Sequence, residues 1–288
     1  MVRRGRRPRR SPPLPAGLAE RAGETHASSA RWTPCETLAC ACVHAPRRAE
    51  RRGTPIGDVD EAEDAVKIGL YIRLLGRPGS QPPAPSWSSV REQALAAEAS
   101  GFDLVVLEDA LMYPDEAGSL GVWESVSMAG AVAAATSTIG IGHAVMNSPY
   151  RAPALTAKIA ATLDEIAGGR YTFGLGLGNT PDDYLLFGIE AEPRYSRFAE
   201  AIQIIHGPLR AGRADFEGEF YQARGAELIL RGPRSTGPPI VIAAGKPKAM
   251  RLVARYADEW NWWTGDRDGI VKLRARRRDG SGLRGSRA

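Results

Sequence analysis

Residues 151–188 contain the sequence pattern that most restricts the fold of this chain. The stretch from Pro153 to Gly168 has the spacing of an amphipathic helix, with proline in its first turn and glycine after its last. A Gly-Gly-Arg turn follows, and then YTFGLGLG (171–178), which reads as a buried strand that ends in a glycine-rich loop. In parallel α/β proteins such a loop lies at the carboxyl end of its strand, where backbone N–H groups bind phosphate. We therefore expect an α/β fold with an anion-binding site at this loop.

The alternation of strand and helix extends over most of the chain. Apolar strands that alternate with helices indicate parallel βα repeats, and six such units favour a (β/α)8 TIM barrel. Because a complete barrel has two further units, the sequence predicts a barrel truncated after about six. Strands are predicted at 66–72, 102–109, 137–146, 171–178, 238–245 and 257–263, helices at 88–100, 121–136, 153–168, 195–209 and 246–257, and a strand-rich insertion that covers the barrel at 213–232.

The two ends of the chain differ in composition from the barrel region. Residues 1–52 carry a net charge of +8 and residues 267–288 a net charge of +6, whereas residues 53–266 carry −9. A nucleic-acid-binding domain usually concentrates basic residues on its folded face, so no specific nucleic-acid partner is predicted. The expected segments are a disordered basic extension at 1–65, the barrel domain at 66–265 and a disordered basic tail at 266–288.

All three cysteines (Cys35, Cys40 and Cys42) lie in the amino-terminal extension. Their spacing, together with His44, matches no common zinc site, so we do not interpret them as metal ligands. The barrel region has no cysteine, which excludes a disulfide framework there and fits a cytoplasmic protein. No apolar run approaches the roughly 20 residues that span a bilayer, and the Arg- and Pro-rich start lacks the apolar segment of a secretory signal. The sequence therefore predicts a cytoplasmic protein without a membrane partner.

Further phrases accompany the glycine-rich loop, in this order: Thr162-Leu163-Asp164, Gly168-Gly169-Arg170, Gly174-x-Gly176-x-Gly178, Asp183-Tyr184-x-x-Phe187-Gly188 and Ala257-Asp258-Glu259-Trp260. Together they resemble the luciferase-like flavin-dependent monooxygenase superfamily. That family includes bacterial luciferase, alkanesulfonate monooxygenases and deazaflavin-dependent reductases. Two positions depart from the family pattern: Ala110 follows Asp109 where a histidine often serves as acid or base, and Glu259 replaces a glycine.

The resemblance implies an oxidoreductase of the TIM-barrel fold that holds FMN or coenzyme F420 at the carboxyl rim of the barrel. With reduced FMN supplied by a partner flavin reductase, such an enzyme oxygenates a small organic substrate with O2. With the deazaflavin F420 it transfers hydride without oxygen, and in both cases the cofactor carries the chemistry. The family also implies a homodimer. The alternative is a truncated, non-catalytic relative whose basic tails bind polyanions weakly and in a salt-dependent manner.

The glycine-rich loop supplies the first candidate residues for holding the cofactor. Gly176, Gly178 and Asn179 close the fourth predicted strand, where glycine lets the backbone approach a phosphate or a ribityl chain. Close packing of helix on strand is the alternative explanation for these glycines. Asp182 belongs to the same loop, or else it satisfies free N–H groups at the start of the next helix.

A second group of candidates follows the fifth predicted strand, at a helix start. Gly245, Lys246 and Lys248 place two ammonium groups beside free backbone amides, an arrangement suited to a phosphate dianion. The alternative is that both lysines are simply solvated on an exposed turn. Because the surrounding domain carries a net negative charge, two lysines at one turn favour the interpretation of an anion-binding site.

His143 ends the third predicted strand and is a candidate catalytic residue. In the family that the sequence resembles, this stretch contains a non-prolyl cis peptide pressed against the flavin. The resemblance therefore implies that His143, Ala144 and Val145 line such a bulge, with Ala144 and Val145 contacting the cofactor. The alternative for the histidine is a half-buried side chain bonded to a neighbouring carbonyl.

Glu108 and Asp109 end the second predicted strand and are the remaining catalytic candidates. Adjacent strand residues face opposite sides of a sheet, so only one of them can face the mouth of the barrel. A carboxyl group near a flavin can transfer protons if burial raises its pKa. A salt bridge at the rim, with Arg151 or another arginine, is the rival interpretation.

Overall fold

The computed structural model of the chain describes residues 39–42, 67–77, 79, 84–115, 118–178 and 181–262. Apart from residues 39–42, the extension predicted at 1–65 lies outside these ranges, as does the tail predicted at 266–288. Those four residues form β1 (Ala39–Cys42), which pairs antiparallel with β2 (Lys67–Ile72). This differs from the disorder predicted there, because the open edge of a sheet offers unpaired N–H and C=O groups to an extended segment.

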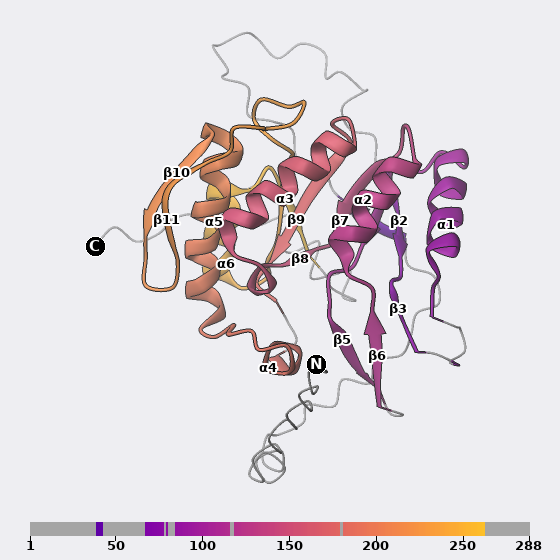
Figure 1. The fold of residues 1–288 in the computed structure, drawn as a ribbon, viewed down its shortest axis with the longest axis horizontal. Helices are drawn as coiled ribbons and strands as arrows, with labels where there is room; N and C mark the ends of the chain where they lie inside the picture. Colours follow the sequence, from indigo (N-terminus) through magenta and orange to yellow (C-terminus); the bar gives the residue numbers. More distant parts are fainter. Residues whose placement is uncertain are drawn as a thin grey trace, which may run out of the picture. The chain divides into compact units, whose positions relative to one another are not determined.

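One curled sheet organises the described residues (Figure 1). Its strand order is β1-β2-β4-β7-β9-β12-β13, and every pairing from β2 onward is parallel. The six strands predicted from the sequence are therefore confirmed in type and order, at shorter lengths. After β2, the strands are β4 (Leu104–Leu107), β7 (Gly140–His143), β8 (Met146–Asn147, paired with β9), β9 (Tyr171–Gly176), β12 (Ile240–Ala243) and β13 (Glu259–Asn261).

Helices follow the parallel strands and pack against one another in chain order along one side of the sheet (Figure 1). This arrangement is the one expected when each crossover between parallel strands contains a helix. The helices are α1 (Trp87–Ala99), α2 (Ser125–Ala135), the short η2 (Ser148–Tyr150), α3 (Pro153–Ile166), α4 (Pro181–Leu186), α5 (Arg194–Ala211) and α6 (Pro247–Tyr256).

Helix α2 begins four residues later than the sequence predicted. Gly121 and Val122 belong instead to β6 (Gly118–Val122), which pairs with β3 (Leu75–Gly76). The carboxylate of Glu124 then caps the helix by accepting hydrogen bonds from the backbone N–H groups of residues 126 and 127. The local sequence at 121–122 favours a helix only weakly, and pairing with β3 makes these residues part of a strand instead.

Alternate strand residues face opposite sides of the sheet, as strand geometry requires. The row that contains Val105 and Ile141 joins apolar residues of α1, α2 and α3 in the main core. The next row (Tyr71, Val106 and Gly142) lies on the other side of the sheet. We call these two sides the helix face and the concave face.

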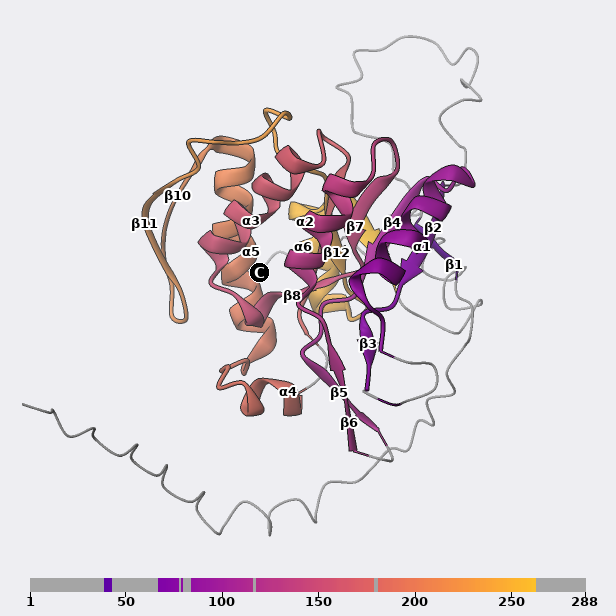
Figure 2. The same cartoon turned by 45° about the vertical axis from the view of Figure 1, so that its right-hand side comes forward.

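Two small sheets accompany the main one (Figure 2). The first contains β3, β6 and β5 (Met112–Asp115) and lies at the same end of the fold as α4. The second is a hairpin of β10 (Arg213–Glu217) and β11 (Gln222–Glu227). The strand-rich insertion predicted at 213–232 is therefore confirmed, but the hairpin packs on α5 through Ala214, Ala223 and Ile204. None of the helices within the described ranges has the length and hydropathy of a membrane span.

Candidate functional site

The carboxyl ends of parallel strands share one edge of the sheet, which we call the rim. The predicted site residues within the described ranges gather there because each follows, or ends, one of these strands. They do not all face the same way, since successive residues alternate between the helix face and the concave face. The rim segments are Glu108–Asp109 after β4, His143–Asn147 at β7 and β8, Gly176–Gly178 at β9 and Ala244–Lys248 after β12.

Glu108 lies on the concave face, two residues beyond Val106. The residue is only 3% exposed. Its Oε1 accepts a hydrogen bond from the backbone N–H of Leu74 at 2.7 Å, and its Oε2 accepts one from the hydroxyl of Tyr71 at 3.1 Å. Among the described residues, no lysine or arginine forms an ion pair with this carboxyl group. Glu108 is therefore a buried acid held by neutral donors.

Burial dominates the acid–base behaviour of this group. Removal from water raises the pKa of Glu108, against the opposing effects of the Leu74 amide, the Tyr71 hydroxyl and the charge on Arg73. Burial, and then the negative charge of Glu108, also raise the pKa of Tyr71. A carboxyl group in this setting keeps its proton at a pH at which an ordinary glutamate is ionised. A raised pKa is the property that the sequence analysis expects of a carboxyl group that donates protons at the rim.

Asp109 points to the helix face, where Arg151 forms a two-point ion pair with it. Arg151 Nη1 lies 2.7 Å from Oδ2 and Nη2 lies 3.0 Å from Oδ1. The Ser125 hydroxyl and the backbone N–H of Asn147 donate further hydrogen bonds at 2.6 and 2.7 Å. The structure therefore matches the rival interpretation, a salt bridge with Arg151, and turns Asp109 away from the concave face.

His143 also lies on the helix face, in register with Leu107. It is 3% exposed, with Nδ1 2.7 Å from the Tyr171 hydroxyl and Nε2 3.4 Å from the Ser125 carbonyl oxygen. Burial lowers the pKa of His143, which favours the neutral imidazole. The structure does not bring the three predicted catalytic residues together: of these, only Glu108 faces the concave side.

The chain between β7 and β8 forms the bulge that the resemblance implied, and its Ala144–Val145 peptide bond is cis. Val145 packs closely against the backbone of β9. A Cβ atom on Gly176 would lie 2.7 Å from Val145 Cγ2, and one on Gly174 would overlap the backbone carbonyl oxygen of His143, where the bulge begins. Close packing against the bulge therefore explains why these two positions are glycine. The cofactor contacts expected of Ala144, Val145 and Gly176 stay predictions.

Gly178 has φ +87°, a left-handed conformation that favours glycine. A Cβ atom there would overlap the Tyr184 hydroxyl and the side-chain oxygen of Asn147. These two groups bond to each other: the hydroxyl donates to Asn147 Oδ1 at 2.8 Å, which docks α4 on the rim. Arg194 Nη1 donates to the Gly178 carbonyl oxygen at 3.3 Å and places a guanidinium group beside the loop.

The segment after β12 brings two lysines to the start of α6. Lys246 is the N-cap residue of α6, and its side chain makes no capping hydrogen bond. The Lys248 ammonium group lies 4.1 Å from the centre of the Tyr195 ring, a cation–π contact. The Trp262 ring packs against Gly245 and fills the space of a Cβ atom. Its indole N–H is buried and has no acceptor among the described residues.

Two predicted contacts cannot be placed. Asn179 lies outside the described residues, and the side chain of Asp182 in α4 is not described. Conversely, the sequence did not single out Tyr71, Asn147 or Arg194. Tyr71 had a usable signal, because a strand register that pairs it with Val106 places its side chain near Glu108. The other two carry no motif.

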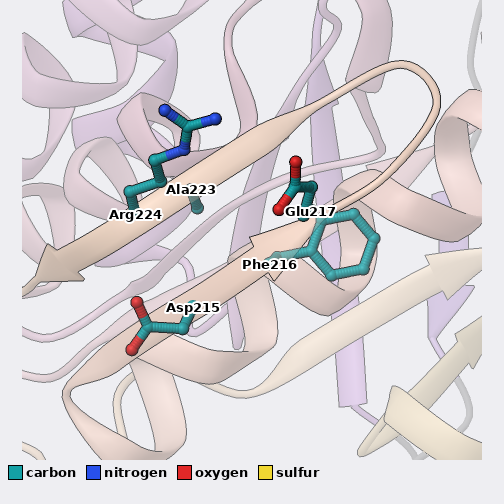
Figure 3. Close-up of a pocket in the computed structure, with 5 residues that line it drawn as sticks. All are labelled: Asp215, Phe216, Glu217, Ala223 and Arg224. Carbon is teal, nitrogen blue, oxygen red and sulfur yellow. The ribbon is translucent and has the colours of Figure 1, made fainter.

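A surface hollow on the β10–β11 hairpin (Figure 3) is separate from these strand ends in the fold. Asp215, Phe216, Glu217, Ala223 and Arg224 line it, and Figure 3 shows their side chains spread over the two strands. Asp215 already accepts a hydrogen bond from the Gly225 N–H at 2.7 Å. None of the predicted site residues lies in this hollow.

The model of the luciferase-like monooxygenase family matches residues 66–286. An uncharacterised protein of Mycobacterium tuberculosis is 32% identical over 199 residues, which cover 64% of this chain and 68% of that protein. The F420-dependent glucose-6-phosphate dehydrogenase of Nakamurella multipartita is 33% identical over 176 residues, which cover 59% of this chain and 50% of the dehydrogenase. The chain thus spans only about half the length of that relative.

A solved structure supports the fold. The oxygenating constituent of 3,6-diketocamphane monooxygenase from Pseudomonas putida, a type II Baeyer-Villiger monooxygenase in complex with FMN, superposes with a TM-score of 0.59 at 17% sequence identity. The alignment covers 77% of this chain and 64% of that one. At this identity the likeness establishes the architecture of the sheet and its helices.

Proposed function

The chain belongs to the luciferase-like monooxygenase family, and we propose that it is an oxidoreductase that uses FMN or coenzyme F420 to act on a small organic substrate. The observation that carries the proposal is the group of donors at the rim. Lys246 and Lys248 supply positive charge, Arg194 adds a guanidinium group that is shared with Glu192, and the start of α6 adds the partial positive charge of the helix dipole. These are the groups that bind a phosphate or a similar anion.

The described residues fit a cofactor with an anionic tail and a flat ring. The anionic tail would contact Lys246 and Arg194, with Lys248 turned toward Tyr195. The buried indole N–H of Trp262, which lacks an acceptor within the described ranges, is a donor that a ligand could satisfy. The bulge at Ala144 and Val145 would support the ring. When bound, the cofactor supplies hydride or oxygen chemistry, and the protein supplies position and exclusion of water.

Glu108 is the residue of the rim that would hold a proton for the reaction. It lies on the concave face, its carboxyl group is buried, and burial raises its pKa. Ala110 occupies the position where the family often has a histidine, so another proton donor is needed if the chemistry is retained. Asp109 and His143 would act indirectly, by fixing the rim segments from the helix face.

The wider proposal covers the complete fold, the macromolecular partners and the substrate. The described residues show a curled sheet of six parallel strands and the short parallel β8, and we propose that the protein shares the TIM-barrel fold of its family. A flavin reductase that delivers reduced FMN and a second copy of the chain are the proposed macromolecular partners. The proposed substrate is a small organic molecule, and its identity would be set by the loops at the rim.

Cofactor binding tests the proposal directly. The full chain is titrated with FMN and with coenzyme F420, each oxidised and reduced, and cofactor fluorescence or absorbance is followed. Saturable binding of one of the two, with a spectral shift that reports a less polar environment, supports the proposal. If the spectra of both cofactors stay unchanged at every protein concentration, the proposed function is contradicted.

A further inference from the structure

We propose that the Tyr71 hydroxyl and the Glu108 carboxyl form a proton-donating pair that binds a neutral carbonyl oxygen of the substrate. This inference rests on the proposed function and deepens it by naming the substrate class. It starts from the hydrogen bond of 3.1 Å between the two side chains on the concave face. The sequence pointed to one of these residues, and the structure adds the other.

The strand register brings the pair together. Tyr71 on β2 is paired with Val106 on β4, and Glu108 follows two residues later on the same face. Tyr71 is half-buried, whereas Glu108 is 3% exposed, so Tyr71 is the more accessible residue of the pair. A molecule that approaches the concave face would therefore reach Tyr71 first. The backbone N–H of Leu74, 2.7 Å from Oε1, fixes the carboxyl from the other side.

The charges around the pair favour an uncharged substrate group. The titratable or charged groups that face Glu108 are Tyr71 and Arg73 from β2 and its continuation, and Tyr113 from β5. Gly142 on the neighbouring strand β7 carries no charge. Arg73 is the one cation in this set, and none within the described ranges forms an ion pair with the carboxyl group, so a substrate anion placed beside it would lose its hydration without gaining a direct ion pair. A ketone or aldehyde oxygen only needs a hydrogen-bond donor.

The pair can donate a proton while each of its oxygen atoms keeps a hydrogen-bond partner. When a hydride donor of the reduced flavin or deazaflavin class gives hydride to the carbonyl carbon, a C–H bond forms there, the π pair of the C=O bond moves to the oxygen, and the oxygen forms a bond to the Tyr71 proton. The phenol O–H bond breaks, and its oxygen takes the proton of Glu108. The carboxylate that remains accepts hydrogen bonds from Leu74 N–H and from the restored hydroxyl. A proton from water then returns the pair to its starting state.

The acid–base properties of the two residues agree with this role. Burial raises the pKa of Glu108 and of Tyr71, so both groups favour their neutral, protonated forms. A protonated carboxyl can donate its own proton to the phenol oxygen across the same 3.1 Å, and the phenol O–H is then free to donate outward. This geometry is absent at Asp109, whose oxygens are occupied by Arg151, Ser125 and Asn147.

Infrared spectroscopy of the full chain without cofactor tests the pair itself. The carboxylic acid C=O band is followed against pH for wild type, Glu108→Gln, Tyr71→Phe and the control Glu92→Gln, which alters an exposed side chain of α1. We expect a protonated carboxyl band at neutral pH in wild type and in the control, its loss in Glu108→Gln and a shift in its frequency in Tyr71→Phe. Identical spectra at neutral pH for wild type and Glu108→Gln would overturn the pair.

Binding of two uncomplicated probes tests the substrate class. Cyclohexanone and cyclohexanecarboxylate have similar shapes, and only the second is charged. In calorimetric titrations of the full chain with its cofactor, we expect cyclohexanone to bind at least tenfold more tightly, and Tyr71→Phe to weaken it about tenfold. Equal or tighter binding of the carboxylate, absence of binding by either probe, or an unchanged affinity in Tyr71→Phe overturns the substrate class.

The two experiments separate failure of this inference from failure of the proposed function. A chain that binds neither cofactor but shows the Glu108 carboxylic acid band contradicts the proposed function and leaves the proton pair standing. A chain that binds cofactor but has an ionised Glu108 at neutral pH supports the function and contradicts the pair.

Discussion

Glu108 and Asp109 are neighbours in the chain, yet their carboxyl groups lie on opposite faces of the sheet. Asp109 is paired with Arg151 on the helix face, and Glu108 accepts hydrogen bonds from neutral groups on the concave face. Two carboxyl groups held in such different environments can take different roles. We assign a structural role to Asp109 and reserve proton transfer for Glu108.

The substitution Arg151→Met tests the structural role of Asp109. The substitution leaves the buried Asp109 carboxylate without its charged partner, and breaking such a pair costs about 3–5 kcal/mol. We expect the free energy of unfolding, measured by urea denaturation, to fall by an amount in this range. The control is Glu190→Gln, because Glu190 pairs with Arg197 at the surface and its side chain is 83% exposed. That change should cost no more than about 1 kcal/mol, and equal effects of the two substitutions would contradict the assignment.

Glu108→Gln should change how stability depends on pH. Burial raises the folded-state pKa of Glu108 above its unfolded value, so the stability linked to its protonation is complete at low pH and is lost as pH rises through the folded-state pKa. Glutamine does not ionise and avoids this loss. The free energy of unfolding of the variant relative to wild type should therefore increase from about pH 4 to about pH 8. A flat or falling difference in urea titrations across this range would contradict a raised pKa.

Gly178→Ala should disturb the docking of α4. The added Cβ overlaps the Tyr184 hydroxyl, and alanine at φ +87° also carries the left-handed backbone penalty of about 1–2 kcal/mol. Gly168→Ala is a matched control, since Gly168 has φ +58° and nothing within 4 Å of its Cβ position. We expect Gly178→Ala to cost more stability than the control in thermal unfolding. A smaller loss than in the control would show that Tyr184 does not occupy this space.

Lys246→Ala should weaken cofactor binding. A hydrogen bond to a charged group contributes about 1.5–3 kcal/mol, so removal of one ammonium group predicts a loss of affinity of about tenfold or more. Lys158→Ala on the exposed side of α3 removes the same charge from a helix that carries none of the predicted site residues, and it serves as control. Fluorescence titration of each variant at low and high salt measures the effect. Equal affinities of the two variants would remove Lys246 from the site.

The order of strands and helices was predictable from the sequence because it depends on local patterns. Apolar strands such as 171–176 alternate with helices that begin at proline and end at glycine, and no distant contact is needed to recognise them. The start of α2 was misplaced because Gly121 and Val122 pair with β3, a contact between segments about 45 residues apart that the local pattern does not encode. The hairpin at 213–227 was recognised, but its docking surface on α5 was not.

The residues of the site were only partly predictable. Sequence position placed Glu108, His143 and Gly178 at strand ends, and the structure places them at one rim. The direction of each side chain depends on strand register, which turned His143 toward Tyr171 and away from the concave face. Tyr71 was missed for the same reason.

Hydrogen exchange with and without cofactor tests the central claim most directly, because it reports where a ligand binds. We expect saturating FMN or coenzyme F420 to slow amide exchange in peptides that cover residues 143–147, 174–178 and 245–250, and to leave the hairpin at 213–227 unchanged. Unchanged exchange at all three rim segments, or protection confined to the hairpin, would contradict a cofactor site at the strand ends.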